Sequence, residues 1–171
     1  AGVAHFLEHK LFESEEGDAF ARFAKTGASA NAYTSFEKTC YLFSTTANFE
    51  QALEILVDFV QNPYFTEQTV QKEQGIIGQE IKMYEDDPNW RVMFNLLRCL
   101  YHNHPVRIDL AGTVESIAQI DKDLLYRCYH TFYNLNNMVL AIAGNFDPER
   151  AMEIIESGLK EVEKVDVTLQ T

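Results

Sequence analysis

Residues 28–61 read ASANAYTSFEKTCYLFSTTANFEQALEILVDFVQ, and the spacing of their apolar side chains changes half-way along. Up to residue 46 the stretch is rich in β-branched and aromatic residues on either side of a polar break at Glu37-Lys38, a pattern that predicts a β-hairpin. From Phe49 to Gln61 apolar residues recur every three or four positions, which predicts an amphipathic helix.

Most of the remaining chain has helical periodicity. Helices are predicted over residues 3–12, 17–25, 66–86, 88–101, 121–133 and 148–162. A short apolar run, residues 138–143, predicts a buried strand. Because helices dominate and the few strands do not alternate regularly with them, we expect an α+β fold in which helices pack on one face of a largely antiparallel sheet.

Length and composition indicate one soluble globular domain. The chain has 171 residues, 46% hydrophobic and 23% charged, and lone domains centre on roughly 100–150 residues. Its net charge is −12 and it has no run of Lys or Arg, so nucleic acid is not an expected partner. No apolar stretch approaches the roughly 20 residues that span a bilayer, and no signal-peptide pattern opens the chain, so we expect no membrane partner and a cytoplasmic location.

The three cysteines, Cys40, Cys99 and Cys128, are odd in number, lie far apart and form no Cys-x-x-Cys pair. Their neighbours in the sequence are largely apolar. We therefore expect reduced, buried thiols.

Three polar side chains share one face of the first predicted helix. At about 100° per residue, His9 lies about 40° from His5 and Glu8 about 60° to its other side, so all three occupy one arc. Zinc binds imidazole nitrogens at about 2.0–2.1 Å and keeps a position for water in catalytic sites. His5 and His9 can thus supply two ligands, and Glu8 can reach the water. Leu7 and Leu11 beside the arc indicate that it faces the interior.

The competing interpretation is a helix with two incidental histidines and a solvated glutamate. The flanking apolar residues weaken this interpretation, because unpaired buried His and Glu side chains are costly. A third ligand would distinguish the two, and the long predicted helix offers Glu73 and Glu80 on one apolar stripe. Because two turns separate these carboxylates, we expect one to contact a metal and the other to support a ligand histidine, or a buried hydrogen-bond network to compensate them.

Two segments, AGVAHFLEHKLFE (residues 1–13) and EQGIIGQEIKMYEDDP (residues 73–88), resemble the pitrilysin/insulinase-type zinc metallopeptidases, the inverzincins with an HxxEH motif, and among them the bacterial YmfH-type zinc proteases. The resemblance implies Zn²⁺ as the cofactor and the first domain of a clamshell-shaped half as the fold. It also implies the roles of the site residues: Glu8 as catalytic base, Glu73 as a support outside the ligand set, and as metal ligands His5, His9 and Glu80.

A further segment, GASANAYTSFEKTCY (residues 27–41), is similar to the family's substrate-side strand. The similarity implies that Asn31 and Ala32 line a cleft where a peptide substrate binds as an added strand. The competing interpretation makes Asn31 an ordinary hairpin residue. We expect His102 and His104 in a surface loop, outside any metal site.

Taken together, these features predict that residues 1–171 form the catalytic zinc-binding domain of a longer multi-domain peptidase. The expected activity is that of a zinc-dependent metalloendopeptidase acting on peptides or unfolded chains, in which a metal-activated water attacks and Glu8 is the general base. A C-terminal half or a partner subunit would complete the clamshell, and the fragment alone would hydrolyse little. The alternatives are a non-catalytic structural or partner subunit of the same family and a zinc hydrolase of non-peptide substrates.

Overall fold

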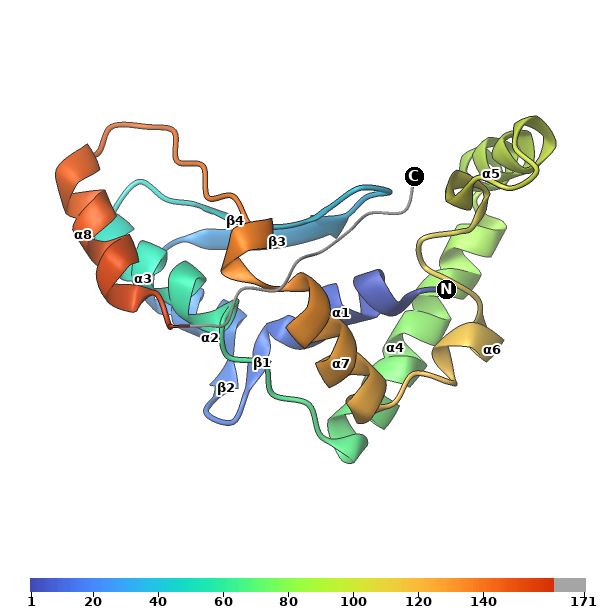
Figure 1. The fold of residues 1–171 in the computed structure, drawn as a ribbon, viewed down its shortest axis with the longest axis horizontal. Helices are drawn as coiled ribbons and strands as arrows, with labels where there is room; N and C mark the ends of the chain where they lie inside the picture. Colours follow the sequence, from blue (N-terminus) through green and yellow to red (C-terminus); the bar gives the residue numbers. More distant parts are fainter. Residues whose placement is uncertain (162–171) are drawn as a thin grey trace. The chain divides into compact units, whose positions relative to one another are not determined.

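The structure, a computed structural model, describes residues 1–161 (Figure 1). In chain order its elements are α1 (Val3–Leu11), β1 (Glu13–Ser14), β2 (Gly17–Asp18), α2 (Ala19–Thr26), β3 (Ser29–Thr34), β4 (Thr39–Ser44), α3 (Phe49–Phe59), α4 (Glu67–Asp86), α5 (Pro88–Leu100), η1 (Pro105–Arg107), α6 (Val114–Ile117), α7 (Lys122–Phe132), η2 (Leu135–Asn137) and α8 (Pro148–Gly158). Helices with a small antiparallel sheet make the fold α+β, as predicted.

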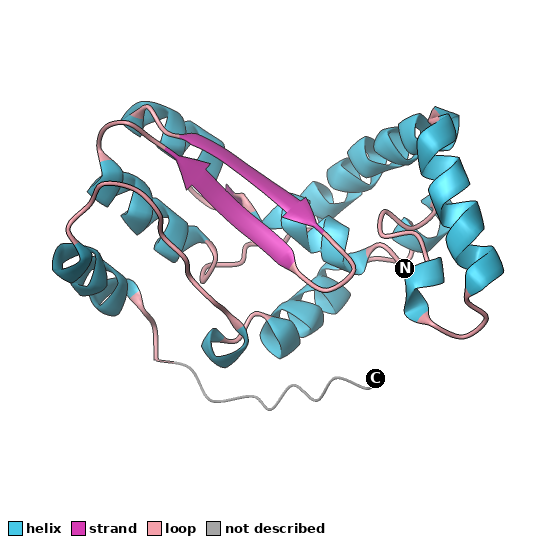
Figure 2. Cartoon of the chain, turned by 90° about the horizontal axis from the view of Figure 1, so that it is seen from above, coloured by secondary structure: helices cyan, strands magenta, loops and turns pink. Residues whose placement is uncertain are grey.

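The predicted hairpin is formed by β3 and β4, which make a two-stranded sheet (Figure 2). Four residues connect the strands, which is too few for a parallel crossover. Within this turn the Ser35 N–H donates to the Lys38 carbonyl at 2.8 Å. The polar break in the sequence is therefore the turn.

Capping side chains fix where the two long helices α4 and α5 begin. The Thr66 hydroxyl accepts a hydrogen bond from the Thr69 N–H and begins α4. Asp87 ends that helix and caps the next one by accepting from the Asn89 N–H, with Pro88 in the first turn. The chain therefore changes direction at residue 87.

The chain divides into two compact units. The first comprises Ala1–Lys10, Tyr33–Cys40 and Phe65–Leu125, and the second comprises Leu11–Ala32, Tyr41–Tyr64 and Tyr126–Thr171. In the first unit α4 packs against α5 and α6, and in the second α3 packs against α2 and α8. The first unit buries Phe6, Leu7, Val70, Ile77, Ile81, Phe94, Ile117, Ile120 and Leu125. The second contains a cluster of Leu53, Val57, Ala151 and Ile154.

The beginning of α1 lies against the loop that precedes α6. Gly2 and Gly112 both have left-handed backbones, with φ of 87° and 78°. A Cβ atom added to Gly2 would lie 2.8 Å from the Ala111 carbonyl oxygen, and one added to Gly112 would lie 3.1 Å from the Gly2 Cα atom. The absence of side chains at these two positions lets the loop approach the helix closely, three residues before His5.

Two predicted elements differ from the structure. Residues 138–143 form no strand: no described strand pairs with them, and Val139 is 96% exposed, although Ile142 packs on the second unit's core. The last helix ends at Gly158 instead of residue 162, which lies outside the described residues. The Gln61 side chain explains this end, because its amide donates to the Gly158 carbonyl at 3.0 Å and accepts from the Lys160 N–H at 2.9 Å.

The cysteines are free, as predicted, but none of them is buried. Cys99 is exposed, whereas Cys40 and Cys128 are half-buried. The prediction of burial was wrong because an apolar neighbourhood in the sequence does not decide which side of a helix or strand faces the core. Among residues 1–161, no helix combines the length and the apolarity needed to cross a bilayer.

Candidate metal centre

Helix α1 carries two histidines one turn apart, and their rings lie edge to face with centroids 4.6 Å apart. The helix forms over residues without Gly or Pro, and its buried side, which includes Phe6 and Leu7, fixes its rotation. The side chains of His5 and His9 are 12% and 24% exposed. The two imidazoles are thus held in a partly desolvated position on one helix face.

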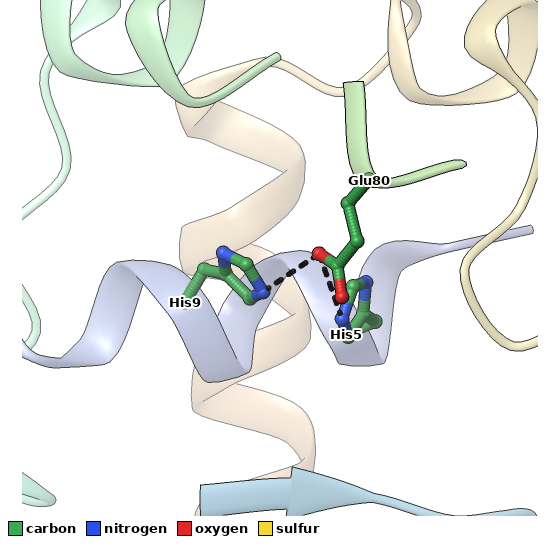
Figure 3. A group of neighbouring side chains, drawn as sticks. All are labelled: His5, His9 and Glu80. Atoms are coloured by element: carbon green, nitrogen blue, oxygen red, sulfur yellow. Dashed lines mark ion pairs between the residues drawn. The ribbon is translucent and has the colours of Figure 1, made fainter. Parts of the chain in front are cut away.

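Helix α4 brings Glu80 to these histidines, as Figure 3 shows. The Glu80 Oε2 atom lies 3.6 Å from His5 Nε2 and 3.4 Å from His9 Nε2. One ligand atom from each of the three residues falls within 4.8 Å of the others, and among residues 1–161 no other such group of His, Cys, Asp or Glu forms. Ligand atoms about 2.0–2.2 Å from a tetrahedral zinc lie about 3.3–3.6 Å apart. The two separations between Glu80 Oε2 and the histidine nitrogens therefore match those expected around a zinc ion.

Glu73 lies two turns before Glu80 on the same helix and contacts the other nitrogen of His9. The distance from His9 Nδ1 to Glu73 Oε1 is 2.9 Å. Because a carboxylate only accepts, His9 Nδ1 is the donor, and in the neutral ring Nε2 keeps its lone pair. That lone pair is on the nitrogen nearest Glu80, as a metal-binding imidazole requires.

The pKa values of the two imidazoles are shifted in opposite directions. Burial lowers the pKa of His5, and the neighbouring His9 lowers it further. Burial also opposes protonation of His9, but the hydrogen bond with Glu73 and the charges of Glu80 and Glu73 outweigh it and raise the pKa of His9. In the metal-free protein His9 is therefore the histidine that takes up a proton first.

Glu8 is buried, with 9% of its surface exposed, and its Oε2 accepts a hydrogen bond from the Thr34 hydroxyl. The Thr34 hydroxyl also lies 3.4 Å from that of Thr39 on β4. Within residues 1–161 Glu8 Oε1 has no hydrogen-bond partner. Thr34 was not among the predicted site residues, although it lies on β3, in the segment that resembles the family's substrate-side strand.

Tyr84, which was also not among the predicted site residues, contacts Glu80. Its hydroxyl donates to Glu80 Oε1, the oxygen other than the one nearest the histidines. Burial and this hydrogen bond raise the pKa of Tyr84 above its ordinary value, so the phenol stays protonated and remains a donor. The sequence feature that could have predicted this contact is the spacing of four residues between Glu80 and Tyr84, which puts both side chains on one helix face.

The apolar stripe around the two glutamates is only partly buried. Ile77 is fully buried, whereas Ile76 and Met83 are 46% and 70% exposed. At about 100° per residue, Ile77 lies about 60° to one side of Glu80, and Ile76 and Met83 lie about 40° and 60° to the other. One edge of the stripe thus faces solvent, and Glu80 lies near the boundary.

Four other residues singled out from the sequence do not belong to this group, and three of them, Asn31, His102 and His104, are exposed. Asn31 and Ala32 are on β3; Asn31 is exposed, and its Oδ1 accepts from the Ala32 N–H at 2.9 Å. His102 and His104 lie in an exposed loop, as predicted. His104 Nδ1 accepts a hydrogen bond from the Val106 N–H at 3.1 Å, which gives that ring a role in the turn.

Relatives of known name share much of this sequence. YmfH of Bacillus subtilis, described as an uncharacterized zinc protease, is 65% identical over 148 residues, 86% of this chain and 35% of its own length. YmxG of the same organism, with the same description, is 34% identical over 170 residues, 95% of this chain and 39% of its own length. The chain therefore spans little more than a third of the curated relatives it matches.

Solved structures share the fold. An M16-like peptidase from Alicyclobacillus acidocaldarius superposes with a TM-score of 0.91 at 51% identity, over 96% of this chain and 39% of the other. The first half of the periplasmic protease PqqL from Escherichia coli gives 0.85 at 25% identity, over 99% of this chain and 39% of the other. The fold is thus that of the first half of M16 peptidases.

Family models match both parts of the sequence. The model described as insulinase (peptidase family M16) matches residues 1–114, and the one described as the peptidase M16 inactive domain matches residues 119–171. Zinc is the cofactor of this family, and the relatives named above are zinc proteases. The chain therefore belongs to the insulinase family of zinc peptidases, peptidase family M16.

Proposed function

We propose that this chain is the catalytic zinc-binding domain of a longer metalloendopeptidase that hydrolyses peptides or unfolded chains. The metal ligands would be His5, His9 and Glu80, and the general base would be Glu8. The observation that carries the proposal is the meeting of one carboxylate and two imidazoles from α1 and α4, with Nε2 to Oε2 distances of 3.4 and 3.6 Å. Two nitrogens and one oxygen are the donor set of a catalytic zinc site with one open position.

Zinc bound there would polarise the scissile carbonyl and lower the pKa of a water molecule. Glu8 is assigned the proton transfer, because Thr34 engages its Oε2 and leaves Oε1 to accept a proton. Its burial limits competition from bulk water. Glu73 acts on His9 by holding Nδ1–H and so the orientation of the ring.

The proposed substrate mode is addition of an extended peptide to the hairpin. Within the described residues β3 pairs only with β4, which leaves one edge of β3 without a partner strand. Main-chain hydrogen bonds at such an edge supply affinity with little dependence on sequence. Asn31 is exposed on β3 and Ala32 is half-buried, so both are available as substrate-binding residues.

The whole enzyme is proposed to require more than this chain. The chain covers 35% and 39% of the two named relatives, and 39% of each of the two compared structures. A C-terminal half or a partner subunit would supply the opposite wall of the clamshell.

Two glutamine variants of the intact protein test these roles. Glu8→Gln should lower peptide hydrolysis by about 10²–10⁴-fold and leave the zinc content unchanged, because Glu8 is assigned proton transfer. Glu80→Gln removes charge from a ligand and should lower the zinc content first. The measurements are metal analysis and digestion of a peptide panel.

Near-normal turnover in Glu8→Gln, or loss of zinc as readily as in Glu80→Gln, would contradict the assignment. A zinc-loaded wild type that cleaves no peptide would instead support the alternative, a non-catalytic partner subunit of the family.

A further inference from the structure

The two oxygens of Glu80 have different neighbours. Oε2 is the atom nearest both histidine Nε2 atoms, whereas Oε1 accepts the Tyr84 hydroxyl. A glutamate side chain has three rotatable bonds and can offer a metal one oxygen or both. Here the hydroxyl occupies one oxygen, and the other is directed at the imidazoles.

Tyr84 is itself held by a series of contacts within the first unit. Its ring stacks on Trp90 of α5, with centroids 4.4 Å apart and planes at 14°. The Trp90 indole Nε1 donates to Asp109 Oδ2 at 2.8 Å, and Asp109 Oδ1 accepts from the Ala111 N–H at 3.0 Å. The tyrosine is therefore anchored from α5 and from the loop before α6, elements that carry none of the proposed ligands.

We propose that Tyr84 is a positioning residue for the metal ligand Glu80, which it holds so that Oε2 alone is presented to the metal. This inference rests on the proposed function, since it concerns the same ligand set. The physical reason is that a carboxylate already fixed by a hydrogen bond loses less conformational freedom when it binds an ion. The opposing interpretation is that Tyr84 only contributes packing between α4 and α5.

The surroundings of Tyr84 make the two interpretations separable. Tyr84 is half-buried and borders an open pocket of about 400 Å³ that Trp90 and Asp109 also line. Removal of the hydroxyl therefore leaves the ring stack in place and creates no closed cavity. Tyr84→Phe should fold normally and change only the contact with Glu80.

The experiment measures the zinc affinity of the intact protein by competition with a chelator. Tyr84→Phe should weaken zinc binding by about 10-fold or more, within the range typical of groups that orient ligands. The matched control is Tyr129→Phe in the second unit, which loses a hydroxyl bonded to the Val60 carbonyl at 2.7 Å. That control should lower the melting temperature but leave zinc affinity at the wild-type value.

A second readout is the visible absorption of the Co²⁺-loaded protein, which responds to the number and arrangement of ligands. Tyr84→Phe should alter this spectrum, because Glu80 is then free to offer both oxygens, whereas Tyr129→Phe should not. Wild-type zinc affinity and an unaltered spectrum in Tyr84→Phe would overturn the inference. Glu80→Gln distinguishes this result from failure of the site itself: if that variant also binds zinc normally, the ligand assignment fails, and the role of Tyr84 fails with it.

Discussion

Two regions of the chain, the candidate metal centre in the first unit and the aromatic cluster around Phe12 and Phe59 in the second, differ in the kind of side chain that meets there. In the first, ionisable side chains of α1 and α4 meet, and each proposed ligand has polar contacts. In the second, aromatic rings meet: Phe12 stacks on Phe20 and on Phe59, with centroids 4.1 and 4.9 Å apart. Burial of ionisable groups opposes folding unless they are paired, whereas burial of rings favours it. Metal binding and fold stability should therefore depend on different residues.

The variant expected to have the largest effect on activity is His5→Ala in the first unit. Residues that only orient a metal ligand typically change metal affinity by up to about 100-fold. Loss of a proposed ligand should weaken zinc binding by more than that, and hydrolysis should fall to background. The melting temperature of the metal-free protein should change little, because His5 Nδ1 is buried and has no hydrogen-bond partner within residues 1–161. Metal analysis and thermal unfolding after treatment with a chelator test both statements; a strongly destabilised metal-free variant would contradict the comparison.

The reverse pattern is expected for Phe59→Ala in the second unit. Phe59 is 3% exposed and contacts Phe12, Phe23 and Tyr41 through its ring. Its truncation should lower the free energy of unfolding by about 3–5 kcal/mol. Zinc affinity, measured below the melting temperature, should remain that of the wild type. A parallel loss of zinc would show that the second unit's core controls the site.

A smaller effect is expected for Glu73→Gln, which keeps the size of the side chain and removes its charge. If Glu73 acts through His9, zinc affinity and turnover should fall by about 10–100-fold without disappearing. A purely structural carboxylate would instead give a lower melting temperature with normal zinc affinity and turnover. Zinc titration, turnover and melting temperature on this one variant separate the two roles.

The smallest effect is a shift in the pH dependence of zinc binding. The neighbouring carboxylates raise the pKa of His9, and a protonated imidazole cannot bind a metal. As the pH falls, zinc affinity should therefore begin to decline at a higher pH than for an ordinary histidine, by about tenfold per pH unit for one proton. In Glu73→Gln the decline should begin at a lower pH. Identical profiles for wild type and variant would show that Glu73 does not govern this proton.

Much of the fold was predictable because local signals and tertiary packing agree. The hairpin around Glu37-Lys38 and the boundary between the helices predicted over residues 66–86 and 88–101 were both identified from the sequence and are present. The strand predicted over residues 138–143 is absent because an apolar run becomes a strand only beside a partner, and the described residues provide none. The four-residue helix α6 was missed, since so short an element has no measurable periodicity.

The grouping of candidate site residues was predictable where the spacing along a helix determines which side chains share one face. His5, Glu8 and His9 on one helix, and Glu73 and Glu80 on another, required only the geometry of the α-helix and one resemblance. The contact of Thr34 with Glu8 was not predicted, because the alternation of side chains along a strand does not show which residue of another element a hydroxyl will reach. The contacts of Trp90 with Tyr84 and Asp109 were equally hidden, since they depend on how α4, α5 and a loop pack.

The close approach of Gly2 to the loop at Ala111 and Gly112 should also limit which amino-acid substitutions the protein tolerates at positions 2 and 112. Any side chain at either glycine must push the loop away from the first turn of α1, which carries His5, and the same loop anchors Trp90 through Asp109. A displacement there reaches both helices that supply proposed ligands. In a library of single variants selected for zinc binding, positions 2 and 112 should be as restricted as the proposed ligands, although neither has a side chain to contribute.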